Sequence, residues 1–562
     1  MKGIYVLMAV LLITPYVLGV PAHSEQPSPS ERATSGGMPS LENISLFIDA
    51  IPYVVGNIIF GVEKNITMEL AIRTGNTEML KEKNQPWIEN AMLEFYTINR
   101  INVSESEMQK FVEKVNALPE GLKNAIALLI YAVNDATLSS RDASKALSEE
   151  EIDFMEKNNE TKSDLLSLLR SEIMGKMTVF PKLDLFSSNS DKLSAITHKI
   201  NSQEMAKESL SLFRAVRYAL PEMEKYKGNY NGTIIEDPSG GIIVGGSGKN
   251  EYEGNYSLII DLGGDDLYKL KGASRRAALT LDISGNDTYR GKVANSFLGI
   301  NMLIDISGND IYDGDNYSLS YSCGGLSLLF DLNGNDAYSS GDHSQGSADA
   351  GGMAFLADIC GRDSYTAKSF SEGFSNGNSF SALIDISGDD AYNAVNHSQG
   401  SADAGGMAFL LDFMGNDRYL ATKNSQGEGE GWANGMKKLS AGVLADFSGN
   451  DIYRAEEFSQ GFGQTAGAGI LADFLGNDAY FSKTSSQACS KFFGIAFLMD
   501  INGENSYHSK DFSKGYEYSD GISVMFDGTN SSSSKVWQIM HYISQNKIAP
   551  LSTFIGALGY EK

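Results

Sequence analysis

The segment FLLDFMGNDRY, residues 409–419, decides the fold because it recurs along the second half of the chain. Other copies read LTLDISGNDTY, MLIDISGNDIY and VLADFSGNDIY, and the series runs from LIIDLGGDDLY at 258–268 to FLMDINGENSY at 497–507. Each copy is too short to bury its own apolar face, so a repeat of this kind is stable only when its copies stack on one another. The copies are therefore expected to form a continuous stack.

The spacing of the copies sets the architecture. Successive leading aspartates are 21, 23, 26, 27, 27, 27, 34, 27, 27 and 27 residues apart. Each copy has a short apolar strand, a turn at DxxGND, an outgoing strand from the Tyr and a second glycine corner such as Ser398-Gln399-Gly400. This pattern predicts a coil of parallel strands with about 11 turns, about 50 Å long at roughly 4.8 Å per turn. A β-propeller fits less well, because its blades need four strands and roughly 40 residues.

Stacking brings the aspartates of successive turns into two columns. The first aspartate of each copy, here called the leading aspartate, occurs at Asp261, Asp282, Asp305, Asp331, Asp358, Asp385, Asp412, Asp446, Asp473, Asp500 and Asp527. The second aspartate, two residues after the motif glycine, occurs at Asp266, Asp287, Asp310, Asp336, Asp363, Asp390, Asp417, Asp451 and Asp478. The second aspartates and the leading aspartates up to Asp473 are the candidate metal ligands.

The negative charge of these two aspartate columns must be neutralised. Two carboxylates about 4.8 Å apart repel by roughly 0.9 kcal/mol at the dielectric constant of water and by roughly 3.5 kcal/mol at an effective value near 20. Summed along two columns, this repulsion rivals the net stability of a domain. Calcium is the expected counter-ion, because it takes about six to eight oxygen ligands from carboxylates and backbone carbonyls. The alternative is that each aspartate accepts hydrogen bonds from the amides of its own turn while its charge stays in solvent.

The string GNDxY resembles half of the hemolysin-type calcium-binding nonapeptide, over roughly residues 242–528. The resemblance implies calcium bound between turns at the motif glycine and second-aspartate positions. The chain departs from that family because the nine-residue period is absent, one such turn occurs in each 27 residues, and Tyr replaces an aliphatic residue. The 27-residue period itself resembles the three-sided right-handed parallel β-helix of pectate lyases and surface adhesins, a likeness of architecture that does not fix function.

Two further columns are expected to be structural. The glycine of GND is expected to supply a positive φ at its corner. The tyrosines from Tyr252 to Tyr507 are expected to stack as an aromatic rib rather than to form a binding platform.

Residues 41–235 predict an all-α domain that precedes the solenoid. Their apolar residues recur at helical spacing, and Ser104 with Glu107 fits the capping box that starts a helix. Pro119 precedes a further apolar stretch, Leu122 to Val133. The pattern indicates roughly seven to nine helices, and it contains no catalytic constellation. The solenoid is expected to occupy residues 236–530.

The two ends of the chain carry their own signals. Residues 1–22 have an early lysine, an apolar run and a small-residue exit, which predict a signal peptide, with an uncleaved membrane anchor as the alternative. Residues 23–40 are expected to be a flexible spacer. Residues 531–562 are expected to form a helical cap over the last turn of the solenoid, with an independent interaction helix as the alternative.

The charge of the chain excludes some classes of partner. The chain has 45 basic and 71 acidic residues, a net charge of −26. Proteins that bind nucleic acids or anionic membranes need a cationic face to displace counter-ions from phosphate, so neither partner is expected. Three cysteines in 562 residues cannot all pair, which argues against a disulfide framework, and the absence of CxxC spacing argues against a zinc site.

A row of polar residues, one in each turn after the SQG corner, has no expected structural role. Four residues after each SQG glutamine, or after Glu372 in its place, successive turns present the candidate ligand-binding residues Asp349, Asn376, Asp403, Glu430 and Gln464, followed by Lys491. Trp432 lies beside Glu430 in the 34-residue turn, and a tryptophan next to carboxylates suits a sugar ring. Asp349 and Asp403 are expected two turns apart, about 9.6 Å, at the upper limit of the carboxyl separation in an inverting glycosidase.

The sequence thus predicts an α+β multidomain protein in which an N-terminal all-α domain precedes a right-handed parallel β-helix. The expected protein is secreted or at the cell surface, is stabilised by calcium, and has a structural, adhesive or glycan-binding role. Cell-surface glycans or proteins are the expected partners, and no transmembrane domain is expected in the mature chain. The alternative is a carbohydrate-active enzyme, a polysaccharide hydrolase or calcium-dependent lyase, that works on the line from Asp349 to Lys491.

Overall fold

The computed structural model describes residues 87–161, 195–431, 440–518 and 520–528. Residues 85–529 form one compact unit, which contains all the helices and strands named below. The predicted signal peptide, spacer and C-terminal cap, as well as Trp432, lie outside the described residues. Within the described ranges, no helix is both long and apolar enough to cross a membrane.

Five helices precede the solenoid among the described residues. They are α5 (Trp87–Asn99), α6 (Glu105–Asn116), α7 (Glu120–Ser144), α8 (Glu149–Thr161) and α11 (Ser202–Glu224). The predicted capping box starts α6: the Ser104 hydroxyl accepts from the Glu107 amide, and the Glu107 carboxylate accepts from the Ser104 amide. Pro119 stands at the N-cap of α7, which packs its buried face against α5 and α11.

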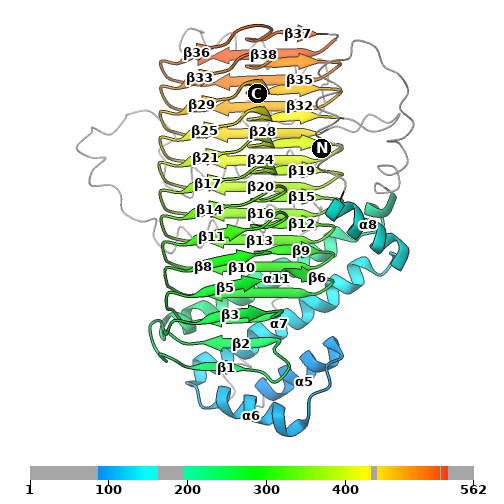
Figure 1. Cartoon of the computed structure of the whole chain (residues 1–562), viewed down its shortest axis with the longest axis vertical. Helices are drawn as coiled ribbons and strands as arrows, with labels where there is room; N and C mark the ends of the chain where they lie inside the picture. Colours follow the sequence, from blue (N-terminus) through cyan, green and yellow to red (C-terminus); the bar gives the residue numbers. More distant parts are fainter. Residues whose placement is uncertain (1–86, 162–194, 432–439, 519, 529–562) are drawn as a thin grey trace, which may run out of the picture. The chain divides into compact units, whose positions relative to one another are not determined.

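The rest of the described chain is a solenoid of stacked strands (Figure 1). Its strands form four sheets, here called A to D. Neighbouring strands are parallel, except that the first strand, β1, pairs antiparallel with β2. Sheet A has 13 strands: β1 (Ile234–Glu236), β2 (Ile242–Gly245), β4 (Leu258–Asp261), β7 (Ala277–Asp282), β10 (Ile300–Asp305), β13 (Leu326–Asp331), β16 (Met353–Asp358), β20 (Phe380–Asp385), β24 (Met407–Asp412), β28 (Ala441–Asp446), β32 (Ala468–Asp473), β35 (Ile495–Asp500) and β38 (Ile522–Asp527).

The other sheets complete each turn. Sheet B consists of β3 (Glu251–Gly254), β5 (Leu267–Leu270), β8 (Thr288–Gly291), β11 (Ile311–Gly314), β14 (Ala337–Ser339), β17 (Ser364–Thr366), β21 (Ala391–Asn393), β25 (Arg418–Leu420), β29 (Ile452–Arg454), β33 (Ala479–Phe481) and β36 (Ser506–His508). Sheet C consists of β6 (Ala273–Ser274), β9 (Asn295–Phe297), β12 (Tyr321–Cys323), β15 (Ser347–Asp349), β19 (Phe374–Asn376), β23 (Ser401–Asp403), β27 (Glu428–Glu430), β31 (Phe462–Gln464), β34 (Cys489–Lys491) and β37 (Glu517–Tyr518). Sheet D consists of β18 (Ser369–Ser371), β22 (Asn396–Ser398), β26 (Lys423–Ser425) and β30 (Glu457–Ser459).

The turns follow the predicted path from sheet A through the GND corner to sheet B, and through the SQG corner to sheet C. Counted from Ala273, where sheet C begins, the coil makes about 9 turns up to Asp527, close to the predicted 11. The register is kept across the 34-residue turn, where Met407 pairs with Ala441 and Asp412 with Asp446. The predicted parallel coil is therefore confirmed, and the propeller is excluded.

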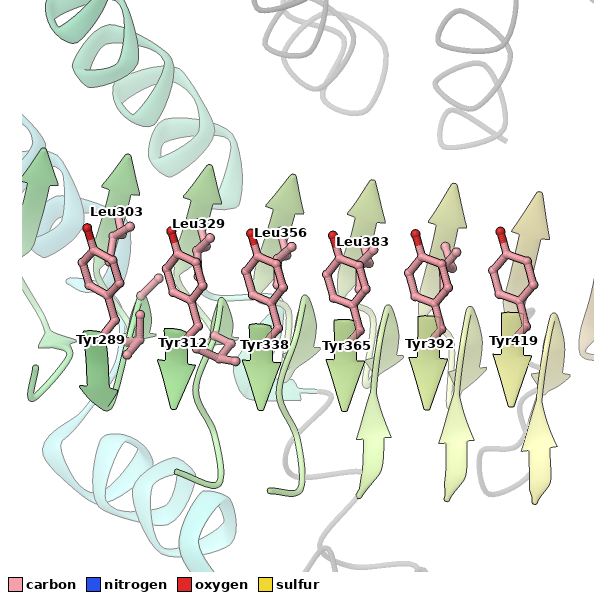
Figure 2. Packing of buried hydrophobic residues seen from close by; sticks show 14 of the residues in the cluster. Tyr289, Leu303, Tyr312, Leu329, Tyr338, Leu356, Tyr365, Leu383, Tyr392 and Tyr419 are labelled. Atoms are coloured by element: carbon pink, nitrogen blue, oxygen red, sulfur yellow. The ribbon is translucent and has the colours of Figure 1, made fainter. Parts of the chain in front are cut away.

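The core of the solenoid consists of two apolar columns. Leucines of sheet A, such as Leu329 and Leu356, lie two residues before the leading aspartate and face the interior. The tyrosines of sheet B pack against them with parallel rings, as Figure 2 shows for Tyr289 to Tyr419. Ring centroids of neighbouring tyrosines are 4.5–4.9 Å apart. The predicted aromatic rib is confirmed.

Helices pack against the first turns of the solenoid. α7 contacts β4, β7 and β10, and the Thr137 hydroxyl accepts a hydrogen bond of 3.0 Å from the Ala277 amide. α11 contacts β13, where the rings of Phe213 and Phe330 meet edge to face with centroids 5.9 Å apart. These contacts join the helices and the early turns in one core.

Candidate metal centre

The leading aspartates lie inside the solenoid. Each ends its strand in sheet A and pairs in register with the leading aspartate of the next turn, as Asp331 does with Asp358. Alternate residues of a strand share a face, so the carboxylate points to the same side as the leucine two residues earlier. The ten leading aspartates from Asp261 to Asp500 are 0% exposed. The predicted column is present, and it is buried.

The tyrosine column holds one oxygen of each of these leading aspartates. The hydroxyl of Tyr312 donates a hydrogen bond of 2.5 Å to Oδ2 of Asp331 in the next turn, and the hydroxyl of Tyr365 donates one of 2.7 Å to Oδ2 of Asp385. The same bond recurs in ten turns, from Tyr252 with Asp261 to Tyr480 with Asp500. This bond was not predicted from the sequence. A signal for it existed, since a buried tyrosine hydroxyl needs a hydrogen-bond acceptor.

Backbone amides hold the other oxygen in several turns. Oδ1 accepts the amide two residues later, at 2.8 Å for Ser284 with Asp282 and 3.1 Å for Ser307 with Asp305. The same bond occurs at Asp261, Asp331 and Asp446. The amide capping of the predicted alternative is therefore present in these turns, whereas its solvent-exposed charge is not.

The second aspartates form a further buried ladder. From Asp287 to Asp478, Oδ1 of each accepts a hydrogen bond from the backbone amide of the second aspartate in the preceding turn, at 2.6 Å for Asp310 and for Asp336. Oδ1 of Asp266 accepts from the backbone amide of Asn250. In all nine second aspartates, Oδ2 has no hydrogen-bond partner among the described residues. These residues are at most 3% exposed. A buried carboxylate oxygen without a donor is costly unless another group compensates it.

The two columns meet in groups of three carboxylates. Eight groups of at least three His, Cys, Asp or Glu side chains occur among the described residues, and in each group one ligand atom of every residue lies within 4.8 Å of the others. The groups include Asp261, Asp266 and Asp282; Asp282, Asp287 and Asp305; Asp305, Asp310 and Asp331; Asp331, Asp336 and Asp358; and Asp363, Asp385 and Asp390. Clustered carboxylate oxygens are the ligands that calcium prefers.

The glycine of GND is needed for a different reason from the predicted one. Except in the first and last copies, this glycine does not have a positive φ. Instead, a Cβ at Gly361 would overlap the carbonyl oxygen of Gly334 and lie 2.5 and 2.6 Å from the carboxylate oxygens of Asp363. Close approach between turns therefore requires glycine here. Positive φ occurs at the SQG corner, with φ of 55° at Gln399 and 74° at Gly400.

Burial changes the protonation equilibrium of both columns. Desolvation raises the pKa of Asp287 to about 7, of Asp336 to about 8 and of Asp363 to about 9, and neighbouring carboxylates add to each shift. The same causes hold the pKa of the leading Asp305 well above its ordinary range. The buried charge must therefore be balanced by a cation or removed by a proton.

The predicted ligand-binding residues do form one line on sheet C. Asn376 pairs in register with Asp403, Asp403 with Glu430, and Glu430 with Gln464. The Asn376 amide donates a hydrogen bond of 3.0 Å to Oδ1 of Asp349.

The carboxylate of Asp349 has partners on both oxygens. Its Oδ2 accepts a 3.1 Å hydrogen bond from the Tyr321 hydroxyl and lies 3.2 Å from Nδ1 of His343. His343 is separated from His397 by Phe370, whose ring stacks between the two imidazoles at 4.7 and 5.0 Å. These contacts hold the side chains of Asp349 and His343 in fixed positions on the coil.

The SQG corner contains a buried amide column whose function the sequence analysis did not predict. Nε2 of Gln399 donates to the carbonyls of Tyr392 at 3.2 Å and Leu420 at 3.1 Å, which ties the corner to the next turn. The same pair of bonds recurs at Gln345, Gln426, Gln460 and Gln487. Glu372 occupies the equivalent place in one turn and is 0% exposed.

Comparisons with known proteins do not extend these observations. No family model, curated protein or solved structure matches the chain.

Proposed function

We propose that this chain is a secreted or cell-surface protein whose solenoid binds calcium in its aspartate columns and acts as a structural or adhesive element, with cell-surface glycans or proteins as partners. One observation carries the proposal: in all nine second aspartates a buried carboxylate oxygen lacks a hydrogen-bond partner among the described residues. A hard divalent cation satisfies such oxygens without needing a donor.

The charge balance favours a divalent cation. A turn such as that of Asp305 and Asp310 buries two carboxylates and no basic side chain on the two columns. One Ca²⁺ per turn neutralises both, whereas the same two charges left unpaired would cost several kcal/mol each. Calcium sites built from carboxylates also suit the calcium concentration outside cells, in line with the predicted signal peptide.

A structural or adhesive role fits the solenoid better than catalysis does. The polar line on sheet C is the alternative site for a carbohydrate-active enzyme, and it needs two carboxyl groups free to face a sugar. Asp349 instead receives hydrogen bonds from Asn376 and Tyr321. We therefore assign the polar residues of sheet C from Asp349 to Gln464 to contact with a glycan or protein partner, and not to catalysis.

Removal of calcium tests the proposal. Chelation of the purified full chain is expected to lower its melting temperature by about 10 °C or more, because each ion held by the folded state alone adds roughly 2–3 kcal/mol at saturation. Differential scanning calorimetry with and without chelator measures the shift, and elemental analysis measures the bound calcium.

The control is added calcium, which should restore the original melting curve when in excess over the chelator. A chain that contains no calcium and melts at the same temperature under both conditions would refute the proposal. Protonated aspartates would then be the state that neutralises the columns.

A further inference from the structure

Four consecutive carboxylate groups are linked through shared residues. Asp282 lies in the group with Asp266 and in the group with Asp287. Asp305 likewise lies in two successive groups, and so does Asp331. Each second aspartate between them, in contrast, lies in one of these groups. In these four groups, the leading and second aspartates therefore differ in how many sites they can serve. The group of Asp363, Asp385 and Asp390 is built differently, because it contains two second aspartates and one leading aspartate.

We propose that the calcium ions of these four groups form one continuous column, one ion to each turn, in which neighbouring ions are bridged by a shared leading aspartate. This inference rests on the proposed function and specifies how its sites are built. Since turns of a parallel coil are roughly 4.8 Å apart, neighbouring ions would have the same separation. A carboxylate bridges two cations at such a distance by giving one oxygen to each.

The second aspartates supply the independent evidence for the sites. Oδ2 of Asp287 and of Asp310 has no hydrogen-bond partner among the described residues, and each residue is 1% exposed. Their Oδ1 atoms are held by backbone amides of the preceding turn, which fixes each carboxylate. The carboxylates that would meet the ions are thus positioned before binding, which lowers the entropic cost of coordination.

The leading aspartates keep capacity for two ions. Oδ2 of Asp305 accepts from the Tyr289 hydroxyl, and Oδ1 accepts from the Ser307 amide. A carboxylate offers about four lone-pair positions, so each oxygen can accept one hydrogen bond and still bind one cation. The tyrosine contact also places an aromatic ring beside every bridging carboxylate.

The ion content of the wild-type chain gives the first test. With shared leading aspartates, all eight groups can be filled, so we expect about eight calcium ions per full chain. Without sharing, the four linked groups can hold only two ions, so the count falls by at least two, to about six or fewer. Equilibrium dialysis followed by elemental analysis measures the count. Terbium, excited through the tyrosine column, should report the same number of sites by luminescence titration.

Two isosteric variants give the second test. Asp305→Asn should remove two ions because it breaks two groups, whereas Asp310→Asn should remove one. Asp315→Asn, at an exposed aspartate of the same turn, is the matched control and should remove none. The pair Asp331→Asn and Asp336→Asn repeats the comparison one turn further along, should Asp305→Asn fail to fold.

The outcomes separate this inference from the proposed function. A wild-type count of six or fewer, or equal losses in the leading and second variants, would overturn the shared column while leaving calcium binding intact. A chain that binds neither calcium nor terbium would overturn both.

Discussion

At Glu372, a carboxyl group stands where five other turns have the amide of a glutamine. Glutamines in other turns donate two hydrogen bonds to backbone carbonyls, as Gln399 does to Tyr392 and Leu420. A carboxylate has no hydrogen to donate, and a protonated carboxyl has one. Burial raises the pKa of Glu372 to about 8. The neutral form is therefore the one that suits this corner.

This shift makes stability depend on pH. The folded-state pKa lies above the unfolded value of about 4.3, so the stabilisation is complete below that value and is lost as pH rises through about 8. The loss is about 1.4 kcal/mol for each pH unit in this window. Glu372→Gln should remove this component and raise stability at pH 9, measured by urea unfolding at pH 5, 7 and 9.

Glu504→Gln, at an exposed glutamate in a later turn, is the matched control and should leave the pH dependence of the wild type unchanged. Equal pH profiles for wild type and Glu372→Gln would show that Glu372 does not titrate in the folded state.

At the residue scale, the sequence predicted which aspartates share a column, but not that their carboxylates are buried. The repeat placed Asp331 and Asp358 in one column, and the alternation with Leu329 contained the information that both point inward. Two remedies for the repulsion were predicted, calcium between the turns or amide capping with the charge in solvent, and neither prediction included full burial of the carboxylates. A buried tyrosine hydroxyl signals that it needs an acceptor, but the choice of Asp331 as the acceptor for Tyr312 depends on distances across the coil that no local pattern specifies. The same holds for the bond from Gln399 to the next turn.

At the scale of the element, the GND corner is set by how closely successive turns approach. A Cβ at Gly361 would overlap the Gly334 carbonyl oxygen, so Gly361→Ala should push two turns apart at their buried carboxylates. Overpacking of this kind costs about 1–3 kcal/mol. Urea unfolding of the variant should show a loss of this size, together with weaker calcium binding in the adjacent turns.

Arg362→Ala provides the comparison in the same turn. Arg362 is exposed, and its contact with the previous turn is a backbone amide that alanine retains. Its effect should stay within about 0.5 kcal/mol. If Gly361→Ala were equally mild, the spacing of the turns would have to be more adjustable than the close contact implies.

The 27-residue repeat was predictable because stacked turns must have similar lengths. The role of the glycine in the GND corner was not predictable. A glycine in a turn permits both positive φ and close approach, and sequence alone does not separate the two. The structure separates them by corner: close approach at Gly361 and positive φ at Gly400.

At the scale of the whole described unit, the two ends of the solenoid differ. α7 packs against β4, β7 and β10, and α6 contacts β1. In the last turn, by contrast, Phe512, Tyr518 and Ile522 are 57%, 49% and 36% exposed. Because each turn is stabilised by its neighbours, a turn with fewer buried contacts opens first.

Hydrogen exchange measures this difference directly. Amides of β35 and β38 should exchange faster than those of β13 and β16, with protection rising along the coil away from Asp527. Calcium should extend the protected region towards the last turns. Fastest exchange in the turns beside α7 would contradict the expected order of opening. The sequence predicted helices before the solenoid, but not which strands they touch, because such contacts join residues far apart in the chain.

The 34-residue turn shows that the coil tolerates added length. β24 and β28 keep their register on either side of it, from Met407 with Ala441 to Asp412 with Asp446. An insertion between sheets C and A is thus independent of the ladder that carries the fold. Evolution can vary this segment, and a protein engineer can graft a foreign epitope there, without redesigning the scaffold beneath.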